Sequence, residues 1–459
     1  MKAISKISLA TLLCAIILFT TTQLVLADLQ NTTYNSPFLP LNIPRANIGL
    51  TPLFSPDHST KEETELVMSA KKTIDIAIPG FDSWSGCTYP KDGCMGCSAT
   101  DLLNNEKFPI FQVLINQIVQ HGVKVRLLTN KYDDKMCSGK MDLLTYLKIA
   151  GADVRYYTTT TFLHAKYITI DGCKSAISSI NFSQTSFRRN REAGILVNEC
   201  NNAAGVVKFS QGVFEYDFFH GVPLDVDYSQ YSKSDIHMIQ TSTATVTIPE
   251  NMHFANCDAS SGDIQEFNDN YNISISASPD YAYGFLMSAL NQVKKSLKIS
   301  IYEISHPDLC DYVIQLGNKG INLKIFASHY VFAKSEALEA YQCYRKLVDN
   351  NINVVLSAKQ CLEFSHEKYW VIDDNILMMS TGNWRGSDYP NPPYVFPPKK
   401  GNSSTWRNVN RDFTLRIDGQ TAILKKFLAV LDNDYQQGYP YSPSTSTSPI
   451  KQSINIRNY

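Results

Sequence analysis

The sequence predicts an α/β protein made of two similar halves, each a mixed β-sheet flanked by helices. Two observations indicate this fold. The pattern His-x-Lys-x4-Asp occurs twice, each time followed by an Asn, and the copies lie roughly half the chain apart. Before each copy, apolar strand-like runs alternate with helix-like stretches, which is typical of a sheet covered by helices. We therefore expect the halves to pair about a pseudo-two-fold axis, with one active site at their interface.

The N-terminus predicts a targeting segment. Lys2 and Lys6 precede an apolar run over 7–19, and Val25-Leu26-Ala27 places small residues where a signal peptidase cuts. The run is shorter than a bilayer-spanning helix requires. We expect a cleaved signal peptide over 1–27, with an uncleaved anchor as the alternative. The mature chain is then expected in the secretory pathway, either in the lysosomal or endosomal lumen or secreted.

The first half is predicted over 28–220, with strands over 73–78, 122–130, 152–157, 175–180 and 193–198, and helices near 100–121, 140–150 and 203–219. The second half is predicted over 279–435, with strands over 296–304, 321–328, 351–356, 376–380 and 413–417, and helices over 307–319, 334–349 and 419–433. The polar segment 221–278, with one strand-like run over 243–248, is interpreted as a connection. The Pro/Ser/Thr-rich tail 436–459 is expected to be disordered.

Ten cysteines follow the signal, and an even number in a secreted chain predicts up to five disulfides. Cys94-x-x-Cys97 resembles half of a zinc site, but no second pair has matching spacing. Sequons predict glycosylation at Asn31, Asn272 and Asn402. Asn181 also lies in a sequon. We expect it to be buried at the end of a strand and therefore unmodified.

The duplicated motif supplies the candidate site. The first copy contains His164, Lys166, Asp171 and Asn181, and the second contains His366, Lys368, Asp373 and Asn383. A single match in a chain of this length has a chance expectation on the order of a few hundredths. Two copies with the same downstream Asn therefore indicate a duplicated half-site, and the residue types indicate phosphodiester chemistry.

Residues two apart on a strand face the same side, so the His and Lys of each copy project together. The Asp has the opposite parity, so within the catalytic motif it is expected to anchor or orient the strand. Two His, two Lys and two Asn that converge would form a donor-rich pocket for a phosphate. One His can attack phosphorus while the other protonates the leaving oxygen, through a phosphohistidine. The lysines replace a divalent cation, so no metal or other cofactor is expected.

Two further carboxylates occupy matching places, since Glu192 and Asp412 each follow an Arg directly. We expect each to hydrogen-bond one histidine and fix its tautomer. Nearby, Arg188, Arg189 and Arg191 form a basic cluster that is interpreted as a solvated face rather than as a substrate clamp.

The second copy carries an insertion, because the interval from Asn383 to Asp412 is much longer than that from Asn181 to Glu192. We interpret it as either a lid that contacts substrate or a surface excursion. It includes side chains that could stack on or attract a substrate, namely Tyr389, Tyr394, Phe396, Trp406, Lys399 and Lys400.

The motifs resemble the HKD signature of the phospholipase D superfamily, although the turns Ser178–Asn181 and Ser380–Asn383 lack its leading Gly. The signal-like N-terminus, the cysteines, GVKVRLLTN, TGNW and VFEYDFFHG resemble the phospholipase D3/D4 luminal branch. The resemblance implies the two-half fold, the phosphohistidine route, independence from metals, and His164 as the nucleophile. The D3/D4 resemblance implies the 5′ end of single-stranded nucleic acid as a substrate.

We expect a phosphodiesterase that hydrolyses phospholipid, such as phosphatidylcholine, to phosphatidic acid and the free headgroup. The alternative is a luminal 5′-exonuclease on single-stranded nucleic acid, and a third reading is a catalytically silent binding protein. The net charge of −1 means that any surface that attracts nucleic acid or membrane must be local. Peripheral membrane contact fits a lipid substrate, no stable protein partner is predicted, and the sequence leaves the oligomeric state open.

Overall fold

The computed structural model describes residues 38–81, 94–104, 108–132, 135–249, 261–396 and 405–443. Several sequence predictions lie outside these residues. They are the signal peptide, the sequons of Asn31 and Asn402, Lys399 and Lys400, Cys87 and Cys257, and the tail from residue 444 onward.

The first half contains the elements β1 (Leu41–Ser55), α2 (Ser59–Met68), β2 (Thr73–Ala77), α3 (Ala99–Leu103), α4 (Pro109–Val119), β3 (Lys124–Thr129), α5 (Leu143–Ala150), β4 (Asp153–Tyr156), β5 (Phe162–Leu163), β6 (Lys166–Ile170), β7 (Lys174–Ser178), α6 (Gln184–Arg188), β8 (Glu192–Asn198), α7 (Val206–His220) and β9 (Val222–Pro223). Local signals set several helix ends. The Asp142 side chain accepts the N–H of Thr145 and caps α5, and Gly151 ends that helix with a φ of 123°.

A connection that includes η1 (Tyr228–Gln230) and α8 (Lys233–Thr241) leads to the second half. That half contains β10 (Phe267–Ala277), α9 (Ala282–Leu290), β11 (Ser296–Ile301), α10 (Pro307–Asn318), β12 (Asn322–Ala327), α11 (Lys334–Asp349), β13 (Val354–Leu356), β14 (Lys368–Ile372), β15 (Ile376–Ser380), β16 (Asn410–Arg411), β17 (Phe413–Asp418), α12 (Ala422–Gln437) and β18 (Tyr439–Pro440). Pro307 begins α10, at the position where a missing N–H costs nothing.

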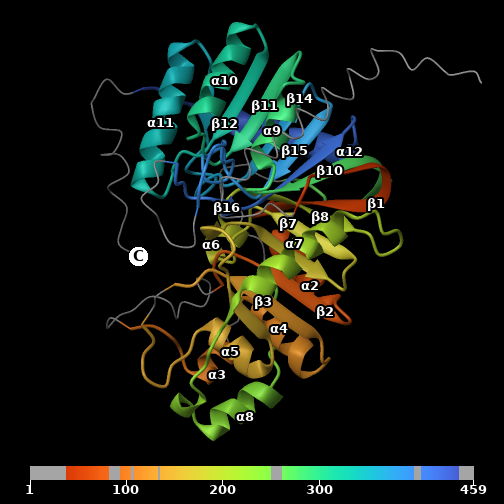
Figure 1. Cartoon of the computed structure of the whole chain (residues 1–459), viewed down its shortest axis with the longest axis vertical. Helices are drawn as coiled ribbons and strands as arrows, with labels where there is room; N and C mark the ends of the chain where they lie inside the picture. Colours follow the sequence, from red (N-terminus) through yellow and green to blue (C-terminus); the bar gives the residue numbers. More distant parts are fainter. Residues whose placement is uncertain are drawn as a thin grey trace, which may run out of the picture.

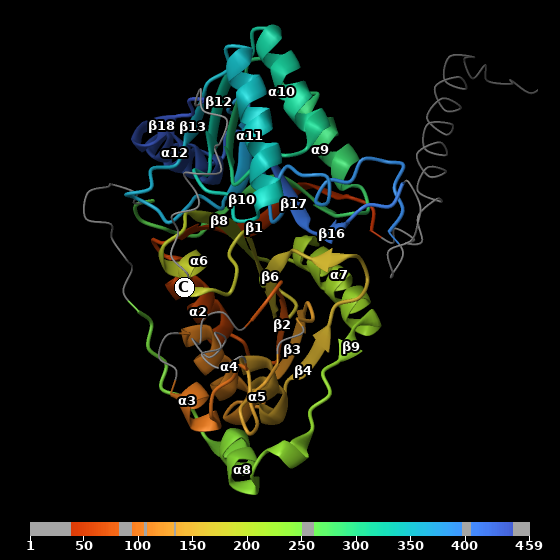
Figure 2. The ribbon, with the colours of Figure 1, turned by 90° about the vertical axis from the view of Figure 1, so that its left-hand side faces the viewer.

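One mixed sheet runs through both halves in the described part of the chain, in the order β18-β13-β12-β11-β14-β15-β17-β10-β1-β8-β7-β6-β2-β3-β4-β9. Its centre is the antiparallel pair of β1 and β10, which crosses the waist of the molecule in Figure 2. Outward from this pair, both halves have the same order of antiparallel and parallel neighbours. The predicted pseudo-two-fold arrangement of mixed sheets is confirmed, and the two sheets are joined edge to edge.

Two boundaries and one strand predicted from the sequence are wrong. The connection was expected to extend to residue 278, but 267–277 form β10 at the centre of the sheet. The run 243–248 is not a strand. The tail was expected to be disordered from 436, but α12 extends to Gln437, and β18 pairs with β13 through Val355 and Pro440.

The hydrophobic core is divided into layers, and one of them is shared by the two halves. Separate clusters lie beneath the outer helices of the first and second halves. A central cluster joins buried residues of both halves, among them Leu50, Tyr167, Ile273 and Phe427. Because this core crosses the pseudo-two-fold axis, the two halves share one hydrophobic core. Figure 1 shows the second half stacked on the first along the longest axis of the molecule.

All eight cysteines of the described residues are disulfide-bonded, and three of the pairs are Cys94–Cys137, Cys173–Cys200 and Cys310–Cys343. The zinc alternative for Cys94 is therefore wrong, because this cysteine is bonded to Cys137. These bonds are compatible with a secreted or luminal protein. Within the described residues, no helix has both the length and the apolar character needed to cross a membrane.

Candidate active site

The two motifs meet where backbone hydrogen bonds connect the two halves. The N–H groups of His164 and Ala165 donate to the carbonyl oxygen of Arg411, at 3.0 and 2.7 Å. In the pseudo-two-fold-related contact, the N–H of His366 donates to the carbonyl of Arg191 at 2.7 Å. β5 and β16 form a short parallel pair beside the first contact, between Leu163 and Arg411. Each motif histidine is therefore positioned by a backbone carbonyl of the opposite half.

The orienting carboxylates also cross between the halves. Nδ1 of His164 lies 3.0 and 3.2 Å from the carboxylate oxygens of Asp412. Nδ1 of His366 lies 2.8 Å from Oε2 of Glu192. The structure thus contains both predicted contacts. In each of them the histidine and the carboxylate come from different halves, so neither half alone has a complete pair. With the proton on Nδ1, Nε2 of each ring keeps a lone pair for chemistry.

Two hydroxyl groups that the sequence reasoning did not single out hold these carboxylates. Oγ of Ser179 donates to Glu192 at 2.6 Å, and Oγ1 of Thr381 donates to Asp412 at 2.7 Å. Both residues stand two positions before the motif Asn, and a hydroxyl at the same place in both turns was the available signal. The turn that follows β7 or β15 therefore fixes the acid that orients a histidine.

Arg191 and Arg411, which precede the carboxylates, are completely buried. Arg191 binds Asp57 of its own half and Asp434 on α12, at 2.9 and 2.7 Å. Arg411 makes the corresponding pairs with Asp280 and with Asp217 on α7, at 2.7 and 2.8 Å. The interpretation of Arg191 as part of a solvated face is wrong, because its guanidinium clamps the two halves together.

Lys166 and Lys368 are buried at the starts of β6 and β14, and each ammonium donates to the carbonyl of its own motif histidine. Burial lowers the pKa of Lys166 to about 8 and that of Lys368 to about 7, although carboxylates oppose the shift. Burial also lowers the pKa of His366 to about 4, against the effect of Glu192, and holds the pKa of His164 well below its ordinary value. An anion in this pocket would favour the protonated form of each group.

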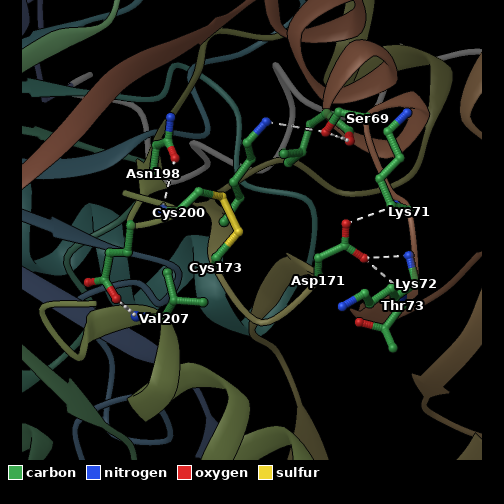
Figure 3. Close-up of a disulfide and its surroundings, with 12 residues drawn as sticks. Ser69, Lys71, Lys72, Thr73, Asp171, Cys173, Asn198, Cys200 and Val207 are labelled. Carbon is green, nitrogen blue, oxygen red and sulfur yellow. Dashed lines mark hydrogen bonds between the residues drawn. A yellow bond between two sulfur atoms is a disulfide. The ribbon is translucent and has the colours of Figure 1, made fainter. Parts of the chain in front are cut away.

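Asp171 and Asp373 lie at the other end of their strands and do not face the histidines. The Asp171 carboxylate accepts the backbone N–H groups of Lys71, Lys72 and Thr73 at 2.7–2.8 Å (Figure 3). Asp373 accepts the equivalent N–H groups of Lys294, Lys295 and Ser296. These contacts fit the expected anchoring role. They argue against a direct catalytic role, because backbone donors occupy both carboxylates.

The two motif asparagines have different surroundings. Asn383 is buried, its side-chain oxygen has no hydrogen-bond partner among the described residues, and its N–H donates to Asp388 at 2.6 Å. Asn181 is partly exposed, so the expectation that it is buried is wrong. Contact of either amide with substrate stays a prediction.

Of the three sequons predicted to carry glycans, Asn272 lies in the described residues and is exposed on β10.

The insertion in the second copy folds inward in its described part. Tyr389, Tyr394 and Phe396 are buried, so they cannot stack on a substrate as the sequence suggested, while Trp406 is half-buried. The Tyr389 hydroxyl lies 2.9 Å from Ser380 Oγ and 2.7 Å from Thr414 Oγ1. The inward fold places Asp388 at 3.7 Å from Nδ1 of His164. Sequence reasoning missed Asp388, although its position in an insertion that directly follows the motif Asn was a signal.

The ligand atoms of His164, Asp388 and Asp412 lie within 4.8 Å of one another, a spacing that could hold a metal ion. Donors already occupy the carboxylates. Asp412 binds His164 and Thr381. Asp388 accepts bonds from Asn383, Ser387 and Asn410. The donor set therefore fits a hydrogen-bond network better than a metal centre.

A row of aromatic rings leads from His366 to the surface. The rings of Tyr302 and Phe364 lie 4.8 and 6.0 Å from that of His366. The ring of Tyr330 lies 6.1 Å from Phe364 and 6.5 Å from Phe332, which is 80% exposed. We call these four residues the aromatic path. No sequence pattern marked them, because they come from three separate segments.

A buried acid, Glu303, stands beside this path. Its carboxylate has no hydrogen-bond partner among the described residues, and Nη1 of Arg385 lies 3.7 Å away. Burial raises the pKa of Glu303 to about 8, against the effect of Arg385. At neutral pH this side chain is therefore mostly a neutral carboxylic acid.

Comparisons with known proteins identify relatives of this arrangement. A family model described as "Cardiolipin synthase, PLD-like domain" matches residues 64–211 and 286–389, more than half of the chain, in one segment from each half. A search of curated proteins found no match.

Among solved structures, phosphatidylserine synthase of Haemophilus influenzae is similar over 90% of this chain and 94% of its own, at 12% identity and a TM-score of 0.55. Nuc of Salmonella typhimurium, a phospholipase D family member, aligns with 38% of this chain and 100% of its own, at 14% identity and a TM-score of 0.31. NucT of Helicobacter pylori aligns over the same shares at 18% identity, with a TM-score of 0.27.

Proposed function

Because this chain belongs to the phospholipase D superfamily, whose members are phosphodiesterases and phosphotransferases, we propose that it hydrolyses a phosphodiester through a phosphohistidine. The observation that carries this proposal is the pair of crossed contacts, His164 with Asp412 and His366 with Glu192. They leave two imidazoles with free Nε2 atoms at one interface, beside two buried lysines. Membership of the D3/D4 branch stays a prediction.

In the first step, Nε2 of His164 attacks phosphorus, and the bond from phosphorus to the leaving oxygen breaks. The proton on Nε2 of His366 goes to that oxygen. In the second step, Nε2 of His366 takes a proton from water as the oxygen of that water attacks phosphorus, and the P–N bond breaks. Lys166 and Lys368, with Asn181 and Asn383, are proposed to stabilise the charge on the non-bridging oxygens.

For the substrate we propose a phospholipid such as phosphatidylcholine, with phosphatidic acid and the free headgroup as products. An exposed apolar side chain near the site suits a bilayer surface, because Trp, Phe and Leu side chains insert between the headgroups and the acyl chains. Phe332 is such a residue. Peripheral contact with a membrane follows from this proposal.

The test compares hydrolysis of phosphatidylcholine vesicles and of 5′-hydroxyl single-stranded DNA at pH 5 and pH 7. His164→Ala and His366→Ala should each abolish hydrolysis. The exposed His121→Ala serves as the matched control and should retain it. Chelation with EDTA should leave the rate unchanged. Activity that survives either motif substitution, or that is lost with EDTA, would contradict the mechanism.

A second candidate substrate is single-stranded nucleic acid, cleaved from its 5′ end by the same chemistry. The aromatic path favours it, because successive rings are the platform on which unpaired bases stack. Phe332→Ala should then raise KM for single-stranded DNA roughly tenfold, as one lost stacking contact would. If KM changes for phosphatidylcholine vesicles and not for DNA, the lipid proposal gains and the nucleic-acid candidate fails.

We place the protein in the secretory pathway, in an endosomal or lysosomal lumen or outside the cell. The disulfides and the exposed sequon of Asn272 support this location. Peptide mapping of protein from a eukaryotic host should find a glycan on Asn272. A glycan on Asn181 would contradict the proposed contact of that residue with substrate.

A further inference from the structure

The two histidine half-sites are not equivalent. His164 Nδ1 has two carboxylates nearby, Asp412 at 3.0 Å and Asp388 at 3.7 Å. His366 has Glu192 at 2.8 Å as its one carboxylate partner within 4 Å among the described residues. Its ring packs instead on Tyr302 and Phe364. The extra acid at His164 comes from the insertion, for which the first half has no counterpart of similar length.

A glycine at position 382 leaves space for this second acid. A Cβ on Gly382 would lie 2.8 Å from the carboxyl carbon of Asp412 and 3.0 Å from the Cβ of Asp388. The corresponding position in the first half is Ile180, a buried side chain. A side chain at position 382 would therefore clash with both acids, and glycine avoids that clash.

Asp388 is also held in a fixed direction. One carboxylate oxygen accepts the N–H of Asn383 at 2.6 Å, and the other accepts Nδ2 of Asn410 at 2.5 Å. The side chain is fully buried. The residue at the matching place in the first half, Ser186, is bonded to Ser183 at the start of α6. His164 thus has a second buried carboxylate in a fixed orientation. The corresponding position in the first half, beside His366, has no carboxylate.

We propose that Asp388 is a positioning residue that stabilises the cationic ring of phosphorylated His164, and so biases the covalent intermediate toward this histidine. This inference rests on the proposed function. When Nε2 of His164 bonds to phosphorus and the P–O bond breaks, the ring gains a positive charge while Nδ1 keeps its proton. Hydrolysis breaks the P–N bond and removes that charge. A second carboxylate therefore lowers the energy of the intermediate relative to both flanking states.

The consequence is a pair of opposite rate effects. Without the Asp388 charge, phosphorylation of His164 should slow and dephosphorylation should accelerate, because the intermediate loses stabilisation that the free enzyme does not need. A residue that only supports the fold would slow both steps or neither. We expect the intermediate to be destabilised about tenfold, the equivalent of one pKa unit at the ring, and each rate constant to change by a part of that factor.

The experiment uses the full chain and bis(p-nitrophenyl) phosphate, a phosphodiester that is neither lipid nor nucleic acid. Stopped-flow measurement of nitrophenolate gives the burst amplitude and both rate constants. An alkaline quench followed by mass spectrometry of the peptide that contains His164 measures the adduct directly. The wild type should show a burst, and Asp388→Asn should lose most of it. Ser186→Ala, at the matching place in the first half, should burst like the wild type.

A swapped variant separates charge from structure. Asp388→Asn combined with Asn410→Asp keeps a hydrogen bond between these positions but moves the carboxylate away from His164. We expect it to melt like the wild type and to lack the burst. A normal burst in the swapped variant or in Asp388→Asn would overturn this inference and leave the proposed function standing. A wild type with neither burst nor adduct would overturn both.

Discussion

Glu192 and His366 come from different halves of the chain, yet Oε2 of Glu192 lies 2.8 Å from Nδ1 of His366. The pseudo-symmetric contact joins Asp412 to His164. The pocket therefore exists only when the halves are docked, and the docking contacts are part of the site itself. Arg191 and Arg411 illustrate this, because each stands directly before one of these carboxylates and binds a helix of the opposite half.

Removal of the charge on Glu192 should abolish most of the activity. In Glu192→Gln, the amide can no longer hold the Nδ1–H tautomer of His366 or stabilise its cation. We expect kcat to fall roughly 10⁴-fold, as in hydrolases in which the acid behind a catalytic histidine is replaced by its amide. Steady-state kinetics on bis(p-nitrophenyl) phosphate measure the effect.

Glu363→Gln is the matched control for this substitution, since Glu363 is exposed and pairs with Arg189 on the surface. It should leave kcat unchanged. If Glu192→Gln retained more than a tenth of the wild-type kcat, His366 would not depend on this carboxylate.

Arg191→Met should destabilise the whole protein. It leaves Asp57 and Asp434 buried without their cation, and breaking a buried pair in this way costs about 3–5 kcal/mol. The exposed Arg189→Met should cost less than about 1 kcal/mol. Urea unfolding measures both. A single cooperative transition is expected because the central core spans both halves. Equal stability of the two variants would refute the clamp.

The sequence could predict the halves and the histidine–carboxylate pairs because the necessary signals are local and repeated. In each copy, a strand places His and Lys on one face. Because the pattern occurs twice, each half supplies the carboxylate that orients the histidine of the other half. β10 was missed for a physical reason. Directly after its first residue, Phe267, come the polar, exposed residues Asn268, Asp269 and Asn270, which are typical of a linker. Only its position between β1 and β17 makes it a central strand.

Long-range partners explain the other errors. In the sequence, Arg191 is typical of a surface residue. Its buried partner Asp434 is 243 positions away, and only the fold brings the two side chains together. Asp388 lies in a segment whose proline and aromatic content suggests a loop, and its distance to His164 depends on how that segment folds back. Hydrophobic periodicity carries no information about such pairs, because both partners are polar and each is buried by the other.

Asp373→Asn should weaken the fold and spare the chemistry. Burial alone raises the pKa of Asp373, but three backbone N–H donors and Lys295 outweigh it and hold the pKa below its ordinary value. The carboxylate therefore contributes stability at neutral pH, and this contribution is lost as the pH falls through the lowered pKa. Because solvent screens this partly exposed carboxylate, we expect a cost of about 1–2 kcal/mol at pH 7. The difference from wild type should shrink below about pH 4.

The neighbouring Asp374→Asn is the control for this anchor. Asp374 has a similar backbone conformation but forms a single surface pair with Lys298. Its loss should cost less than about 1 kcal/mol. Both variants should keep the wild-type kcat under conditions in which they are folded. A large fall in kcat for folded Asp373→Asn would restore this residue to the catalytic set.

Anion binding should weaken as the pH rises above neutrality. Burial lowers the pKa of Lys368 to about 7 and that of Lys166 to about 8, so the pocket loses positive charge between these values. Dimethyl phosphate keeps one negative charge throughout this range, which makes it a suitable competitive inhibitor. The inhibition constant of dimethyl phosphate should rise about tenfold for each pH unit above the pKa of a lysine that binding requires.

Lys368→Arg is the control, because its guanidinium stays protonated at every pH tested. For this variant the inhibition constant should rise later and less steeply. An inhibition constant for the wild type that is flat from pH 6 to pH 9 would show that the lysines stay charged in the empty pocket, and that the nearby carboxylates outweigh the cost of burial.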